Sequence, residues 1–127
     1  METRKHTEGL SHTSTLTVDD TNTAIALGSG DMPVLATPAM LALMENAAML
    51  TVKDYLEEGM TTVGGQIESS HLRPSGVGSA VIATAILERI DNKKLYFKVS
   101  AYMGDTLIGE GKHLRFIVDK NRFMSKL

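Results

Sequence analysis

Three side chains, Thr37, Glu45 and His71, supply the hydroxyl, carboxylate and imidazole that many acyl-transfer sites use. Thr37 precedes Pro38, so capping a helix would explain it without any chemistry. Glu45 either fills a solvated gap in an apolar helix surface or faces a pocket as a polar group. His71 is the best candidate base because its pKa lies near neutrality, although strand histidines more often have structural roles. His113 is its main rival.

Two further features could serve the same chemistry. Gly64-Gly65 inside a strand-like run predicts a bulge or a close backbone approach, and a free backbone N–H there could donate to an oxyanion. Arg115, in GKHLRFIV, is either a surface charge or a contact to an acidic ligand. The sequence contains no Cys, which excludes disulfides, zinc-thiolate sites and a cysteine nucleophile. It also shows no phosphate-binding glycine loop and no convincing metal-ligand spacing.

The elements that must position these groups follow an α+β order. β-Branched residues between 12 and 27 predict a first strand, and the glycines of 28–31 predict a loop. Ala, Leu and Met dominate 39–56, which predicts a long helix that is apolar on most of its surface. Thr37-Pro38 would start this helix and Gly59 would end it. The remaining chain predicts four strands joined by short turns, at residues 61–72, 77–90, 94–103 and 106–118.

A largely apolar helix must be covered on several sides, and an antiparallel meander can curve around it. The expected fold is therefore a hot dog: a curved antiparallel sheet of about five strands wrapped around one long central helix. The 127 residues predict a single domain, 1–127, with a flexible start at 1–11. A free edge strand invites pairing with a second copy, so we expect a homodimer.

Charge and hydropathy exclude several classes of partner. The formal net charge of −2 argues against nucleic-acid binding through a broad basic surface. The first ten residues lack the apolar region of a secretory signal, and no apolar run approaches the length of a membrane span. We therefore expect a cytoplasmic protein that binds neither nucleic acid nor membrane.

The run from Thr37 to Glu45 (TPAMLALME), then Gly64 and His71, then GEGKHLRFIV, resembles the fluoroacetyl-CoA thioesterase-like branch of the hot dog superfamily. The resemblance implies that Thr37, Glu45 and His71 form the catalytic constellation. It places the oxyanion glycine at Gly64 and a ligand-pocket arginine at Arg115. It also implies a homodimer with sites at the subunit interface, and an acyl-CoA substrate. Coenzyme A is part of that substrate, so no separate cofactor is expected.

One departure concerns the acyl group. Fluoroacetyl-specific members of the family carry phenylalanines in the segment before the catalytic threonine, where they form an apolar lid. The corresponding residues 31–35 of this chain, DMPVL, contain none. The resemblance therefore implies hydrolysis of a short or modest acyl-CoA thioester with the acyl group left open. The alternatives are a non-catalytic acyl-CoA or small-ligand binding protein and, less favoured, a hot dog hydratase or dehydratase.

Helical spacing sets a limit on how the three residues can combine. Eight helical residues separate Thr37 from Glu45, which corresponds to a rise of about 12 Å and a rotation of about 80°. The two side chains cannot touch on one regular helix. They can share a site only across a substrate, through a bend before Pro38, or with the help of a partner subunit.

Overall fold

The computed structural model describes residues 8–127. Most of the start predicted to be flexible, residues 1–7, lies outside the described residues, and Ser11 already belongs to the first strand. In chain order the elements are β1 (Ser11–Thr17), α2 (Ala24–Leu27), α3 (Thr37–Val52), the 3₁₀ turn η1 (Lys53–Tyr55), β2 (Met60–His71), β3 (Ala80–Asp91), β4 (Lys94–Met103), β5 (Thr106–Asp119) and α4 (Lys120–Ser125).

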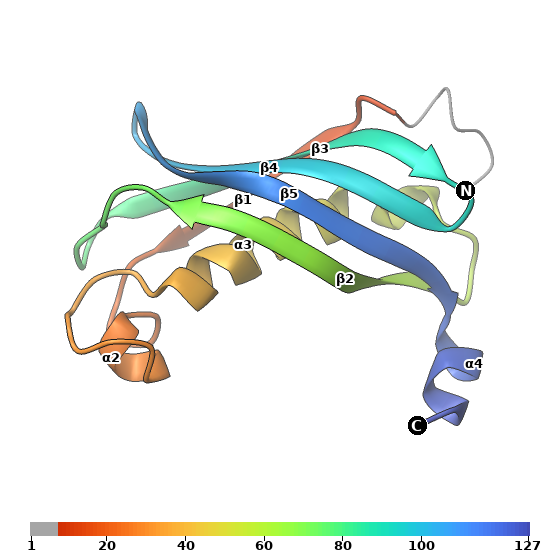
Figure 1. Ribbon diagram of the computed structural model, residues 1–127, viewed down its shortest axis with the longest axis horizontal. Coiled ribbons are helices and arrows are strands. Elements are labelled where there is room, and N and C mark those ends of the chain that lie inside the picture. Colours follow the sequence, from red (N-terminus) through yellow and green to blue (C-terminus); the bar gives the residue numbers. More distant parts are fainter. Residues whose placement is uncertain (1–7) are drawn as a thin grey trace.

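The five strands form one antiparallel sheet in the order β1-β3-β4-β5-β2. Figure 1 shows the sheet curving over α3, which runs along its inner face. This confirms the predicted hot dog fold. Of the predicted four-strand meander, only β3 to β5 pair in chain order. β2 pairs with β5 and not with β3, so the hairpin expected between the strands at 61–72 and 77–90 was wrong. The chain crosses from β1 to the far edge through α3, so β2 becomes an edge strand whose outer backbone groups pair with no strand of residues 8–127.

The core lies between α3 and the inner face of the sheet. Met40, Met44, Ala47 and Ala48 of α3 are fully buried, as the apolar pattern predicted. The helix lies closest to β3 and β1, where small residues such as Ala83 allow a close approach. It packs less closely on β2 and β5. Polar side chains of α3, β2 and β5 can therefore meet on the side of the free edge.

The start of α3 differs from the prediction. Its N-cap is Ala36, with an extended backbone (φ −68°, ψ 139°) and no capping side chain, so Thr37 is the first helical residue and not the cap. The Thr37 hydroxyl does not cap the helix and instead forms a hydrogen bond with His71. The helix also ends earlier than predicted, at Val52, where the chain tightens into η1.

Two other predictions needed correction. The stretch 12–27 is a strand only as far as Thr17, because Asp19 then forms a turn by accepting the Thr21 N–H at 2.8 Å. Thr23 caps the short helix α2 by accepting the Ala26 N–H at 3.2 Å. β3 begins at Ala80, later than the predicted residue 77, because Gly78 occupies a turn with φ +94°.

The helices of residues 8–127 are all too short or too polar to cross a membrane.

Candidate active site

Thr37 and His71 meet where the start of α3 faces the end of β2. The Thr37 Oγ1 lies 2.8 Å from Nδ1 of His71. His71 is half-buried and, like Ile67 and Ser69, points from β2 toward the helix side of the sheet. The sequence alone did not show which face of this strand is buried, and the structure shows that it is the face that carries His71. The pair joins a hydroxyl to an imidazole at hydrogen-bond distance, as a nucleophile and its base require.

The second ring nitrogen of His71 has no such contact. Nε2 is buried and has no hydrogen-bond partner among residues 8–127. Burial lowers the pKa of His71 below its usual value, and the backbone of Arg73 partly opposes this shift. The imidazole is therefore neutral at pH 7 and able to accept a proton. If Thr37 donates to Nδ1, then Nε2 carries the hydrogen and requires an acceptor.

A cleft of about 310 Å³ opens over this pair. Thr37 and His71 line it together with Val34, Leu35 and Arg73. Apolar side chains thus lie beside the hydroxyl and the imidazole, and a cation stands nearby. A small acyl group with an anionic carrier suits such a lining.

Glu45 lies in a second polar cluster, further along α3. A Cβ atom at Gly64 would lie 2.9 Å from Glu45 Oε2 and 3.5 Å from Arg115 Nη1. Gly64 therefore leaves the room that the Glu45 carboxylate occupies. The adjacent Gly65 is the predicted bulge, because the pairing of β2 with β5 shifts register between Gly64 and Gln66. A Cβ at Gly65 would collide with the ring of Phe116.

The guanidinium of Arg115 is held in this cluster by three neutral acceptors. Its Nε donates to Thr62 Oγ1 at 2.9 Å, and Nη2 donates to the Thr62 carbonyl at 3.0 Å. Nη1 lies 3.2 Å from Nε2 of His113. Burial lowers the pKa of Arg115, and Glu45 opposes the shift. An arginine remains protonated even so, which leaves a fixed cation with unused N–H groups beside Glu45 and Gly64.

His113 acts as a neutral support for Arg115. Its Nδ1 lies 2.7 Å from the Gln66 carbonyl, which can only accept, so Nδ1 carries the hydrogen and Nε2 accepts from Arg115. Burial lowers the pKa of His113 most, and the Arg115 charge adds to this, while the Gln66 carbonyl and Glu45 oppose it. Both ring nitrogens of His113 are thus engaged, whereas His71 contacts the Thr37 hydroxyl at the cleft.

The five predicted site residues form two groups within one chain. Thr37 and His71 make the first, and Glu45, Gly64 and Arg115 make the second. Sequence reasoning missed the part played by Thr62, the partner of two Arg115 nitrogens. The support of Arg115 by His113 could have been predicted, because residues two apart on a strand such as β5 point to the same face.

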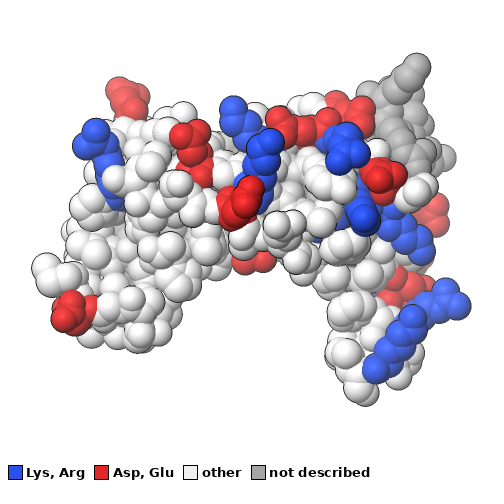
Figure 2. Space-filling model, viewed as in Figure 1, with Lys and Arg blue, Asp and Glu red and all other residues white. Residues whose placement is uncertain are grey.

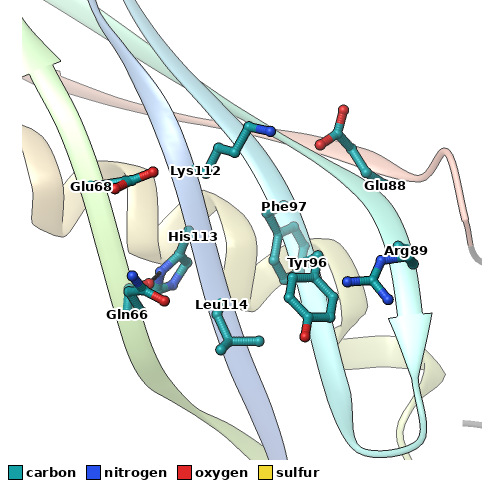
Figure 3. A pocket seen from close by; sticks show the side chains of 9 residues that line it. All are labelled: Gln66, Glu68, Glu88, Arg89, Tyr96, Phe97, Lys112, His113 and Leu114. Atoms are coloured by element: carbon teal, nitrogen blue, oxygen red, sulfur yellow. Dashed lines mark hydrogen bonds between the residues drawn. The ribbon is translucent and has the colours of Figure 1, made fainter.

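The outer face of the sheet carries a separate groove of about 430 Å³. Figure 3 shows Tyr96 and Leu114 forming its floor, with the charged side chains of Glu68, Lys112 and Arg89 around them. Arg89 stacks over the Tyr96 ring at 4.0 Å. None of the five predicted site residues lines this groove. The five predicted site residues thus lie away from this groove, although His113, which supports Arg115, is among the residues that line it. Within residues 8–127, no three His, Asp or Glu side chains gather closely enough to hold a metal ion.

Comparison with known proteins identifies a family and similar chains. The family of fluoroacetyl-CoA-specific thioesterases matches residues 18–121. A fluoroacetyl-CoA thioesterase of Streptantibioticus cattleyicolor is 34% identical over 94 residues, which cover 74% of this chain and 68% of the relative.

Solved structures give the same result. A threonine-to-serine variant of the fluoroacetyl-CoA thioesterase FlK, in complex with acetyl-CoA, superposes with a TM-score of 0.88 at 29% identity, over 94% of each chain. A thioesterase superfamily member from Thermus thermophilus superposes with a TM-score of 0.85 at 27% identity, over 94% of this chain and 88% of that one.

Proposed function

The chain belongs to the fluoroacetyl-CoA-specific thioesterase family, and from this premise we propose that it hydrolyses short or modest acyl-CoA thioesters to the free acid and coenzyme A. The observation that carries the proposal is the contact of 2.8 Å between the Thr37 hydroxyl and His71. It supplies a base with a lowered pKa, in direct contact with a hydroxyl, at the wall of a small cleft. Cytoplasmic location stays a prediction.

One chain alone cannot bring both polar clusters to one thioester. Along α3, Thr37 and Glu45 are separated by a rise of about 12 Å. Along β2, His71 and Gly64 stand seven residues apart, which corresponds to about 20 Å. The acceptor that His71 Nε2 lacks must come from elsewhere, and so must the hydroxyl and base that the Arg115 cluster lacks. A second copy supplies both.

The free edge of β2 offers the contact. Two copies of an edge strand can pair antiparallel about a twofold axis, which makes the interface self-complementary. An axis near Glu68 sets Ser69 opposite Ile67 of the partner subunit, with both side chains on the helix side. Because the bulge at Gly65 absorbs one residue, His71 then lies opposite Gly64 of the partner subunit. Each copy thus joins its Thr37–His71 pair to the partner's Glu45 cluster.

The chemistry follows from this arrangement. His71 removes a proton from the Thr37 hydroxyl or from a water molecule, and the resulting oxygen attacks the thioester carbonyl carbon. The Gly64 backbone and Arg115 stabilise the charge that develops on the carbonyl oxygen. The C–S bond breaks, and the imidazolium returns its proton to the leaving thiolate. Attack by water gives the free acid directly. Attack by Thr37 leaves an acyl ester on its oxygen, which a water molecule deprotonated by His71 then hydrolyses, with the proton returned to the Thr37 oxygen. Glu45 of the partner subunit lies on the open side of His71, where it orients the ring or the attacking water.

The test is an acyl-CoA panel in which free thiol is measured as it forms. The proposal predicts turnover of at least one short-chain member and its loss in a His71→Ala variant. Thermal stabilisation by acyl-CoA without any thiol release would instead favour the non-catalytic binding protein. Full activity of His71→Ala would contradict the mechanism.

A further inference from the structure

The helix α4 carries apolar side chains that the rest of its own chain does not cover. Every residue of α4 is exposed, and Phe123 and Met124 expose 37% and 62% of their surfaces. The helix packs on the strand β5 that it continues and stands away from the body, at the lower right of Figure 1. An apolar helix face left in water marks a surface that a partner covers.

A second exposed apolar surface lies at the opposite end of the molecule, around α2. Ile25, Leu27 and Met32 expose 55%, 48% and 61% of their surfaces. Leu72, at 51%, continues this surface to the Thr37–His71 cleft, which it helps to line. These four residues, called the α2 patch below, therefore adjoin the site.

The topology relates the two surfaces through β2. Asp119, the residue before α4, pairs with Met60 at the beginning of β2, whereas His71 ends β2 beside the α2 patch. In Figure 1 both α2 and α4 extend past the β2 edge, on the side where a second copy would pair. An antiparallel contact between two β2 strands sets the beginning of one beside the end of the other. The partner's α4 then arrives at this copy's α2 patch.

Charges at the two ends are complementary. Lys120, Arg122 and Lys126 make α4 and its end basic. Asp19 and Asp20 precede α2 in the chain and Asp31 follows it, and Figure 2 shows the α2 lobe, at the lower left, as uncharged apart from an acidic group. Opposite charges around two apolar surfaces favour their association and fix its orientation.

We propose that α4 of the partner subunit packs on the α2 patch and covers the Thr37–His71 cleft. In the dimer, each cleft is then covered by the α4 helix of the other chain. The inference rests on the dimer described under Proposed function. The occupant is the face of α4 that carries Phe123 and Met124. Its effect is to hold the acyl chain and to keep bulk water away from the thioester.

Disulfide trapping tests the contact, because the chain contains no Cys. Leu27→Cys and Phe123→Cys variants are made separately, mixed, and oxidised. The proposal predicts a covalent dimer on a non-reducing gel. A mixture of Phe123→Cys with Lys98→Cys, which places the thiol on an exposed position of β4, is the matched control and stays monomeric on the gel. A dimer in solution that forms no Leu27–Phe123 cross-link overturns this inference alone. A monomer in solution overturns the shared site as well.

Kinetics give a second readout. Phe123→Asp puts a charge on the covering face, and we expect KM for the best acyl-CoA to rise roughly five- to tenfold with the dimer intact. Asn121→Asp adds the same charge about 200° round the helix from residue 123, away from the covering face, and serves as the control, with a much smaller rise in KM. Equal KM values for Phe123→Asp and the parent enzyme would contradict the covering role.

Discussion

The hydroxyl of Thr37 and the imidazole of His71 join residues that stand 34 positions apart, with Oγ1 and Nδ1 separated by 2.8 Å. This contact ties the first turn of the central helix to the end of the edge strand. It also explains why Thr37 does not cap its helix, since its oxygen is engaged across the fold and Ala36 takes the cap position.

Replacing the Thr37 hydroxyl separates its contribution to catalysis from its contribution to stability. Thr37→Val keeps the shape and removes the oxygen, and we expect kcat to fall by about 10²–10⁴-fold. Thr37→Ser keeps the oxygen and retains most of the rate. Because Thr37 is exposed and caps nothing, both variants should melt within a few degrees of the parent protein. Thiol-release kinetics and thermal unfolding of the Thr37→Val and Thr37→Ser variants measure these two effects. A fully active Thr37→Val would exclude a chemical role for the hydroxyl.

The pH dependence follows from the state of His71. A base works only when unprotonated, and burial lowers the pKa of His71 below 6.5. The rate should therefore stay level from neutral pH downward past 6.5 and fall only at lower pH, as the ring becomes protonated. The profile of kcat/KM against pH measures this. An acid limb centred above 6.5 would contradict a His71 pKa that is set by burial.

Much of the fold could be read from the sequence because it depends on local patterns. The apolar run of α3, the turns between strands and the Gly64-Gly65 bulge each have a short-range signature, and all were found. The start of α3 at Thr37-Pro38 was predicted to within one residue, but Thr37 was wrongly assigned as the N-cap, because the contact that engages its hydroxyl spans 34 residues. Helix α4 was missed for another reason: six residues without a periodic apolar stripe give no signal of their own.

The site was read in part. Residue types and family resemblance selected Thr37, Glu45, His71, Gly64 and Arg115, and the helical rise predicted that Thr37 and Glu45 stay apart. The grouping of Glu45 with Gly64 and Arg115 came only with the structure. The support of Arg115 by Thr62 required the pairing of β2 with β5, which no single segment contains.

Gly64→Ala tests the Glu45 cluster without disturbing the core. The new Cβ would meet Glu45 Oε2 at 2.9 Å, and a carboxylate at the end of a flexible side chain can move aside. We expect the fold to remain stable and kcat/KM to fall by about tenfold or more as Glu45 and the oxyanion position are displaced. Gly76→Ala, where nothing lies within 4 Å, is the control and should be neutral. Equal activities of the two variants would remove Gly64 from the site.

Arg115→Lys removes the fork that grips Thr62 and His113. An ammonium cannot reproduce contacts made by Nε, Nη1 and Nη2 together, so buried acceptors lose their partner. We expect a loss of about 1–3 kcal/mol in the free energy of unfolding, measured by urea denaturation, together with a higher KM. Arg89→Lys, on the exposed outer face, should cost less than about 1 kcal/mol. Equal stability of the two variants would contradict the structural role of Arg115.

The central claim is that each site combines Thr37 and His71 of one chain with Glu45 and Arg115 of the other. Mixing two inactive variants, His71→Ala and Glu45→Gln, tests it directly. After subunits exchange, each mixed dimer holds one site with both defects and one intact site, so the mixture should recover about a quarter of the parent activity. If all groups of a site came from one chain, the mixture would stay as inactive as either variant alone, and the shared site would be wrong.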